Sequence, residues 1–537
     1  MRRWNGWGDE NHHHPLPKGA DAHLERWLGA SQPTQDAHLA DVAKRVPSSR
    51  LAAHPLVTID PIERIRHARG QSFPDWVALR SGHLDTLPDG VAYPLTDDDV
   101  KDLIAYAKST GIRLIPYGGG TSVAGHINPI SSDTPVLTVD MGRMNQLLAL
   151  DSTSQLATFG AGINGPDLEA QLRAHGLTLG HFPQSFEYAT LGGWIATRSS
   201  GQQSLHYGRI ERLFAGGTVQ TPLGEIRLPA THPASATGPD LREVILGSEG
   251  RMGIITEATV RVSPQPEQEN FYAVFFPSFD HGMAAVREIV QARVPLSMLR
   301  LSTATETMTN LALAGKPSLI HQLERVLAWR GITDQKAMLI YGYTGTRAIG
   351  RVAIRKTHTI AKKHSGVHLG IGKIFGETWR KGRFKTPYLR NTLWEKGYGV
   401  DTLETATDWT TTPRMIQAIE SALQEAMAAF DEPIHVFTHL SHLYPYGTSI
   451  YTSYVFRLHP DADVMLARWH AMKSAASEAI VRLGGTISHQ HGVGIDHAPY
   501  LQAEKGHLGM KSLGTLIKHF DPDGLMNPGK LINLSGG

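Results

Sequence analysis

Alternating apolar and polar runs predict the first regular elements after Tyr93. Thr96 precedes three acidic residues, Asp97 to Asp99. A hydroxyl side chain ahead of an acidic first turn is typical of a helix N-terminus, so we expect a helix through Lys108. The short apolar run at 113–116 then predicts a strand that leads directly into three glycines.

Short apolar runs between glycine- and proline-rich turns predict further elements on both sides of residue 265. Before it we expect strands at 136–139, 156–159 and 254–262, and a helix near 166–175. After it we expect a helix near 282–292, strands at 298–301, 337–343 and 485–491, and a C-terminal helix. Together these elements predict an α+β fold.

The character of the chain changes three times, so we divide it into four parts. The expected parts are a mostly helical extension (1–88), an α+β domain (89–267), a second α+β domain (268–480) and a C-terminal segment (481–537). A length of 537 residues suits two large domains with extensions.

Composition excludes several classes of protein. Hydrophobic residues make up 41% and charged residues 19%, as in globular domains. A net charge of only +2 provides no field toward nucleic acid, so we expect no nucleic-acid partner. Because the sequence has no cysteine, it excludes disulfides, thiolate catalysis and cysteine-bound metals. No apolar stretch approaches the ~20 residues of a membrane span, and we expect a cytoplasmic protein.

Three glycine-rich loops indicate one long anionic ligand. Gly118, Gly119 and Gly120 follow a predicted strand, and Thr121 and Ser122 follow them. Successive backbone N–H groups of such a loop can converge on a pyrophosphate, although a surface turn is the alternative. Two further clusters, within residues 190–201 and 247–255, make a ligand lying across one domain the better interpretation.

A competing motif favours a nicotinamide dinucleotide. Residues 160–165 match G-x-G-x-x-G between a predicted strand and helix, and Glu187 lies about 20 residues further on. The chain then enters the turn-rich stretch 180–183 and not a second parallel strand. We keep this hypothesis as the minor alternative.

Several segments jointly resemble a known class of flavoproteins. The FAD-binding domain of the vanillyl-alcohol-oxidase (PCMH-type) superfamily is similar to residues 116–122, 180–187, 192–194, 200–201 and 247–250. Within it, the alkyldihydroxyacetonephosphate synthase family resembles residues 3–8, 238–240, 382–384, 387–390, 438–442 and 488–494. The resemblance implies a PCMH-type FAD-binding domain followed by an α+β cap domain that shapes the substrate site, with the C-terminal segment near the flavin.

The resemblance also implies the cofactor site. Since Thr121 follows the glycines and cysteine is absent, we expect a non-covalent FAD. Its expected contacts are Pro116, Tyr117, Gly118, Gly119, Gly120, Thr121, Ser122, Pro183, Gln184, Ser185, Thr190, Gly192, Gly193, Thr197, Ser199, Ser200, Glu249, Gly250, Gly253, Ile254 and Ile255.

The catalytic residues are likewise taken from the resemblance. It makes Tyr451 the acid/base and His489 and His491 the polarising groups, while Gln490 departs from the family pattern. As a base near neutral pH, Tyr451 would need a pKa far below its reference of about 10. On a predicted strand His489 and His491 would face the same way.

The histidines leave a metal site open as an alternative. His435, His439 and His442 form one set and His489 and His491 another, with spacings that permit a divalent ion. No acidic residue accompanies either set in the sequence, so we expect no metal.

Arginines supply candidate anion-binding groups. Residues 347–390 hold twelve basic residues against the single acid Glu377, which suits a phosphate, a carboxylate or an anionic membrane surface. Arg300 lies inside an apolar strand, where an arginine needs a partner. Arg300 and Arg390 are the expected anion clamps.

Two enzymatic hypotheses follow. The first, implied by the resemblance, is exchange of the acyl group of acyl-dihydroxyacetone phosphate for a fatty alcohol, with the reacting carbon held at flavin N5 and no net redox change. The second is an FAD-linked 2-hydroxyacid dehydrogenase, favoured by Gln490 and residues 527–530. A flavin-storing protein is a third, weaker possibility. We expect a small lipid substrate with a phosphate or carboxylate, peripheral membrane contact and a homodimer.

Overall fold

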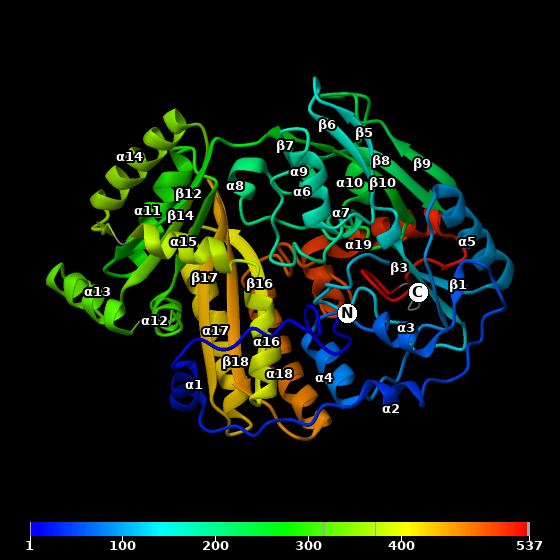
Figure 1. Cartoon of the computed structure of the whole chain (residues 1–537), viewed down its shortest axis with the longest axis horizontal. Helices are drawn as coiled ribbons and strands as arrows, with labels where there is room; N and C mark the ends of the chain where they lie inside the picture. The colour runs from blue at the N-terminus through cyan, green and yellow to red at the C-terminus, as the bar shows by residue number, and fades with distance from the viewer. Residues whose placement is uncertain (1, 315–316, 371, 534–537) are drawn as a thin grey trace.

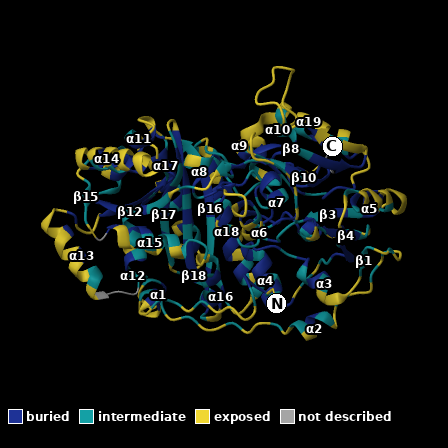
Figure 2. Ribbon diagram, turned by 45° about the horizontal axis from the view of Figure 1, so that its top comes forward, coloured by how far each residue is buried: buried dark blue, intermediate teal, exposed yellow. Residues whose placement is uncertain are grey.

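Two small sheets form one lobe and a large sheet forms the other (Figure 1). The computed structural model describes residues 2–314, 317–370 and 372–533. Buried positions concentrate inside and between the lobes, and exposed ones on the outlying helices (Figure 2). The mixed α+β architecture confirms the expected fold class.

The first small sheet carries the glycine loop at the end of one strand. Its strands are, in spatial order, β1 (Val57–Thr58), β2 (Gly90–Ala92), β4 (Val136–Asp140) and β3 (Arg113–Tyr117), the last three of them parallel. Helix α5 (Asp97–Thr110) begins after Thr96, whose side chain accepts a hydrogen bond from the Asp99 N–H, so the predicted N-terminus is confirmed.

The second sheet is antiparallel throughout. Its order is β5 (Leu147–Asp151), β6 (Leu156–Gly160), β10 (Ile254–Arg261), β8 (Phe214–Thr221) and β9 (Gly224–Leu228). Strand β6 enters α6 (Gly165–Arg173) through the G-x-G-x-x-G motif, but it pairs only with antiparallel neighbours. The motif is therefore not part of a βαβ unit, and the nicotinamide hypothesis is wrong.

Short elements complete this lobe. They are β7 (Leu177–Thr178) paired with β11 (Ser263–Pro264), α7 (Leu191–Ala196), α8 (Ser204–Tyr207), α9 (Ile210–Leu213) and α10 (Arg242–Ile245).

Seven antiparallel strands form the large sheet. Their order is β15 (Val367–His368), β12 (Gln268–Phe276), β14 (Ala337–Gly345), β13 (Met298–Ser302), β17 (Ile434–Tyr444), β18 (Gly447–Arg457) and β16 (Tyr398–Asp408). Its back face packs on α11 (Phe279–Gln291), α14 (Arg347–Lys363), α17 (Thr412–Ala428) and α18 (Ala462–Arg482). Its front face meets α12 (Ala304–Ala312), α13 (Pro317–Trp329), α15 (Gly372–Gly382) and α16 (Thr386–Glu395).

The N-terminal extension is less helical than expected and runs along both lobes. It contains α1 (Ala20–Leu28), α2 (Leu39–Ala43), α3 (Pro61–Arg66) and α4 (Phe73–Ser81), joined by irregular chain. Leu24 and Leu28 of α1 pack with Tyr398 and Val455 of the large sheet. The extension therefore packs against the large sheet and covers part of it.

The C-terminal segment differs from prediction at its start. Residues 485–491 form no strand, because a buried carboxylate and not a neighbouring strand takes up the N–H groups of its last residues. Helix α19 (Leu501–Phe520) follows, and the chain then returns to β3, where the Asn527 N–H donates to the Leu114 carbonyl at 2.7 Å. The C-terminus thereby joins the first lobe.

Candidate active site

A cavity of about 900 Å³ lies between the glycine loops and the front face of the large sheet. Every residue expected to contact the FAD lines it. So do Tyr451, His491, Arg300 and Arg390, whereas His489 does not. The structure thus brings residues from all four parts of the sequence to one site.

The glycine loop after β3 packs too closely on a neighbouring segment for any other residue. A Cβ on Gly119 would lie 1.8 Å from the Tyr188 carbonyl oxygen, and one on Gly118 would lie 2.2 Å from Thr190 Oγ1. Gly120 has a φ of +62°, which favours glycine. Glycine is required here because a side chain would clash with the segment 188–190. The opposite side of the loop lines the cavity.

Unpaired polar atoms in the cavity wall test whether a dinucleotide fits. Buried side-chain atoms without a hydrogen-bond partner include Gln490 Oε1, Asn527 Oδ1, Trp194 Nε1 and Gln202 Oε1, all on residues that line the cavity. Buried polar groups are normally satisfied, so this wall is suited to a polar ligand. These residues, with the glycine loops, fit FAD.

Tyr451 lies at the centre of the front face. On β18 it is directly opposite Glu404 of β16 and His439 of β17, so the three side chains share one face. The Tyr451 hydroxyl donates to Thr402 Oγ1 at 3.2 Å, and its ring stacks on His439 with centroids 5.1 Å apart. Burial raises the pKa of Tyr451 to about 12. The residue is therefore un-ionised at neutral pH, the opposite of what a tyrosine base requires.

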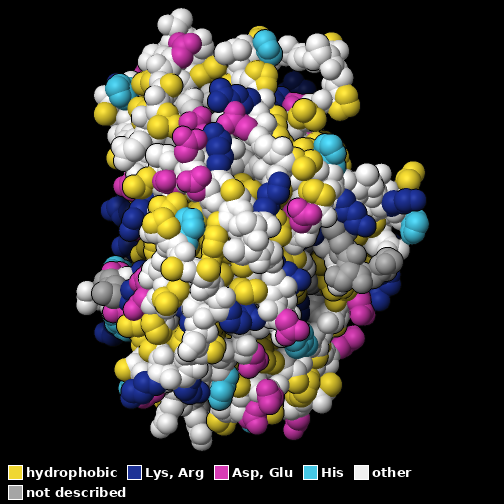
Figure 3. Space-filling model, turned by 90° about the vertical axis from the view of Figure 1, so that its right-hand side faces the viewer, with side chains coloured by type: hydrophobic (Ala, Val, Ile, Leu, Met, Phe, Trp, Pro, Cys, Tyr) yellow, Lys and Arg dark blue, Asp and Glu magenta, His cyan; other side chains and the backbone are white. Residues whose placement is uncertain are grey.

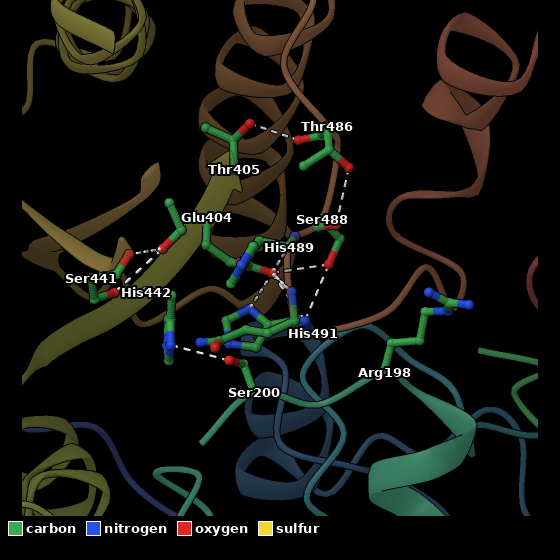
Figure 4. A network of polar contacts seen from close by, with 12 residues as sticks. Arg198, Ser200, Glu404, Thr405, Ser441, His442, Thr486, Ser488, His489 and His491 are labelled. Atoms are coloured by element: carbon green, nitrogen blue, oxygen red, sulfur yellow. Dashed lines mark hydrogen bonds and ion pairs between the residues drawn. The ribbon is translucent and has the colours of Figure 1, made fainter. Parts of the chain in front are cut away.

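The carboxylate of Glu404 organises the C-terminal loop (Figure 4). Its Oε1 accepts hydrogen bonds from the Ser488 hydroxyl at 2.9 Å and from the backbone N–H groups of His489, Gln490 and His491 at 2.9–3.0 Å. Glu404 is only 3% exposed. An acidic residue therefore does accompany these histidines, although it comes from a strand more than eighty residues earlier in the chain.

His489 and His491 do not share one orientation, so that expectation is wrong. Arg209 Nη1 donates to His489 Nε2 at 2.8 Å, and Tyr444 also contacts Nε2, at 2.7 Å. An arginine can only donate, so His489 is neutral with a lone pair on Nε2. Burial and the Arg209 charge hold its pKa well below the ordinary value. His489 supports the loop, and His491 is the imidazole that faces the cavity.

A second buried carboxylate stands on the other side of Tyr451. Glu306 Oε1 lies 2.6 Å from Arg300 Nη2 and 3.0 Å from His439 Nδ1. Arg300 therefore has the partner that its position in an apolar strand requires, and part of its charge is balanced. Sequence reasoning did not identify Glu306, and it gave His439 no catalytic role, considering it only within the family resemblance and the metal-site alternative.

Arg390 is half-buried and has unused hydrogen-bonding capacity. Its guanidinium lies 4.3 Å from the Trp76 ring centroid, and Nη1 donates to the Gln71 carbonyl at 2.6 Å. Its Nη2 has no partner. Burial lowers the pKa of Arg390 from its ordinary value. Arg383, in contrast, is enclosed by aromatic rings and faces Glu269 at 3.5 Å.

His442 lies at a β-bulge with a φ of +51°. Its Nδ1 contacts Ser200 Oγ at 3.1 Å and Ser204 Oγ at 3.0 Å (Figure 4). Bulges and left-handed non-glycine residues concentrate at functional sites. His442 thus joins the large sheet to a flavin loop. Within residues 2–314, 317–370 and 372–533, no three His, Asp or Glu side chains come together as a metal site.

Comparison with known proteins identifies two matching domain models. Residues 88–228 match the model of an FAD binding domain, and residues 265–531 that of the C-terminal domain of FAD linked oxidases. The chain is 32% identical to the alkyldihydroxyacetonephosphate synthase of Dictyostelium discoideum over 482 residues, 88% of this chain and 78% of that protein. It belongs to the alkyldihydroxyacetonephosphate synthase family. FAD is its cofactor.

Two further relatives in the synthase family cover nearly all of the chain. The Trypanosoma brucei brucei synthase is 27% identical over 99% of this chain and 92% of its own length. A solved alkyldihydroxyacetonephosphate synthase structure, 26% identical, superimposes with a TM-score of 0.84 over 98% of each chain.

The synthase-family cavity continues into an apolar arm that the sequence did not predict. Leu16, Leu24 and Trp27 of the N-terminal extension line it together with Phe437 and Val455 of the large sheet. Trp27 stacks on His435 with ring centroids 4.1 Å apart. The extension therefore helps to build the site.

Replacing Glu404 tests whether its carboxylate holds the loop. In Glu404→Ala, the four donors at residues 488–491 lose their acceptor, so we expect the free energy of unfolding to fall by about 1–3 kcal/mol and FAD retention to drop. Glu404→Gln keeps a carbonyl acceptor and should lose less. Chemical denaturation and flavin absorbance measure both effects.

The matched control is Glu478→Ala, at an exposed position of helix α18, which should leave stability and FAD retention unchanged. Equal behaviour of Glu404→Ala and this control would contradict the role of Glu404.

Proposed function

We propose that the protein is an FAD-dependent enzyme that exchanges the acyl group of acyl-dihydroxyacetone phosphate for a fatty alcohol. One observation carries this proposal: the glycine loops, Tyr451 and His491, and the side chains of the apolar arm all line one cavity. Membership of the synthase family supports the same reaction.

Each side chain has a distinct task in this proposal. The flavin, when bound without a covalent link, supplies the ring at which the reacting carbon is held. Tyr451, un-ionised, donates a proton to the departing carboxylate and regains one from the hydroxyl of the incoming alcohol. His491, fixed by Glu404 through its backbone, polarises the substrate. Arg390 binds the substrate's anionic group, since its buried Nη2 is a donor without a partner among the described residues.

The apolar arm is suited to the alkyl chain. Ligand sites of this kind combine an apolar lining with a few polar groups that fix orientation. Here the polar pair His439 and Tyr451 is followed along the same face of β17 and β18 by the apolar Phe437 and Val455, which also line the cavity. A chain with a polar head would be held with its head at the flavin.

The wild-type protein loaded with FAD tests the proposal. Acyl-dihydroxyacetone phosphate and a fatty alcohol should yield the ether lipid and a free fatty acid, with the flavin absorbance back at that of the oxidised form when turnover ends. Mass spectrometry measures the products. Anaerobic bleaching of the flavin by a 2-hydroxy acid, with no ether product, would favour a dehydrogenase and contradict the proposal.

We also propose that α13, α14 and α15 contact an anionic membrane surface. Apolar side chains are exposed there, with Trp329 at 81%, Ile374 at 46% and Val326 at 45%. The basic residues of 347–381 share these elements at the end of the molecule opposite the first lobe (Figure 1). Figure 3 shows the opposite side of the molecule, the right-hand side of Figure 1, and there the two signs of charge are interspersed. Among the described residues, no helix has the length and hydrophobicity to cross a bilayer.

Vesicle binding tests this surface. The wild type should co-sediment with vesicles containing anionic lipid and less with neutral ones, and Trp329→Ala should weaken binding because an exposed interfacial aromatic is lost. Binding of the variant equal to wild type would contradict the assignment. Homodimer formation stays a prediction.

A further inference from the structure

We infer that His439 is the base that takes the proton from the substrate carbon, and that Glu306 positions it. The inference rests on the proposed function. It assigns the acid role to Tyr451 of β18 and the base role to His439 of the neighbouring strand β17.

Hydrogen bonding fixes the tautomer of His439. Its Nδ1 lies 3.0 Å from Glu306 Oε1, and a carboxylate only accepts, so Nδ1 carries the hydrogen. Nε2 then holds the lone pair, and it has no hydrogen-bond partner in the described part of the chain. His439 also lines the cavity. The side chain is therefore arranged as a neutral imidazole with a free basic nitrogen.

Glu306 is held ionised in spite of its burial. It is 1% exposed and occupies the first turn of α12, where the helix dipole favours negative charge. Burial opposes ionisation, but the adjacent His439 and Arg300, both hydrogen-bonded to the carboxylate, lower the pKa of Glu306 to about 2. A fixed carboxylate on Nδ1 orients an imidazole and stabilises the imidazolium that forms when Nε2 accepts a proton.

The charged and titratable neighbours of His439 separate the roles of acid and base. They are Arg300 of β13, Glu306 of α12, Tyr451 of β18 and His442 of β17. Burial lowers the pKa of His439 and raises that of Tyr451, so one is a base and the other an acid at the same pH. Adjacent groups whose pKa values are driven apart are the expected pattern for acid and base.

The proton step balances without a further reactant. The C–H bond at the carbon bearing the acyl ester breaks, and an N–H bond forms at His439 Nε2. The electron pair passes to the adjacent ketone oxygen of the substrate. When the new ether is complete, Nε2–H returns the proton to the same carbon.

Hydrogen exchange isolates this step from turnover. With FAD-loaded protein in D₂O, wild type should exchange the hydrogen of that carbon. His439→Asn keeps a donor for Glu306 but has no base, so exchange and turnover should both fall by at least ~10²-fold, the lower end for general base catalysis, with partial rescue by imidazole. Tyr451→Phe should lose turnover by a similar factor while retaining exchange. His507→Asn, an exposed position on α19, is the matched control and should match wild type.

The pH profile of wild-type exchange gives a readout that needs no variant. With His439 as the base, exchange should rise through the acidic range and level off by neutral pH, because the lowered pKa leaves the imidazole free above it. With Tyr451 as the base, exchange would continue to rise toward alkaline pH.

Three results would overturn the inference: exchange that survives in His439→Asn, exchange that is abolished in Tyr451→Phe alone, or an alkaline rise in wild type. Wild-type protein with full FAD that neither exchanges nor turns over acyl-dihydroxyacetone phosphate would show that the proposed function itself is wrong.

Discussion

Burial of two carboxylates on one sheet face is the constraint on which the site depends. Glu404 and Glu306 lie on either side of Tyr451, and each is at most 3% exposed. A buried charge is costly unless it is paired and hydrogen-bonded, so each carboxylate must accept hydrogen bonds from several nearby donors. Glu404 accepts hydrogen bonds from the backbone of the C-terminal loop, and Glu306 accepts them from Arg300 and His439.

This requirement explains how distant parts of the chain form one cavity. Hydrogen bonds to Glu404 hold the C-terminal loop against the large sheet. The chain beyond α19 returns to β3, beside the glycine loop. His442 contacts Ser200 and Ser204, which ties the large sheet to a second flavin loop. These contacts hold the two lobes together around the cavity. Activity and stability should therefore depend on the same few buried groups.

Sequence reasoning accounted for the glycine loops that line the cavity more fully than for the buried carboxylates beside Tyr451. Gly118 to Gly120 form a local motif whose physical requirement, close approach of bare backbone, is visible in the sequence itself. Glu404 and Glu306 have no such local signal, because their partners depend on strand register and on a helix packed across the sheet. The loop at 485–491 resembled a strand because its apolar pattern does not reveal that a carboxylate takes up the N–H groups of His489 to His491. The contribution of Leu24 and Trp27 to the apolar arm was not predicted for the same reason, because it depends on contacts between segments that are distant in the sequence.

The central claim is that the flavin ring meets the face formed by Tyr451, His439 and His491. A crystal structure of the FAD-loaded protein measures this directly. The account predicts the pyrophosphate over residues 118–122 and the isoalloxazine ring in contact with the side chain of Tyr451. A ring placed outside this cavity, or turned away from the large sheet, would contradict it.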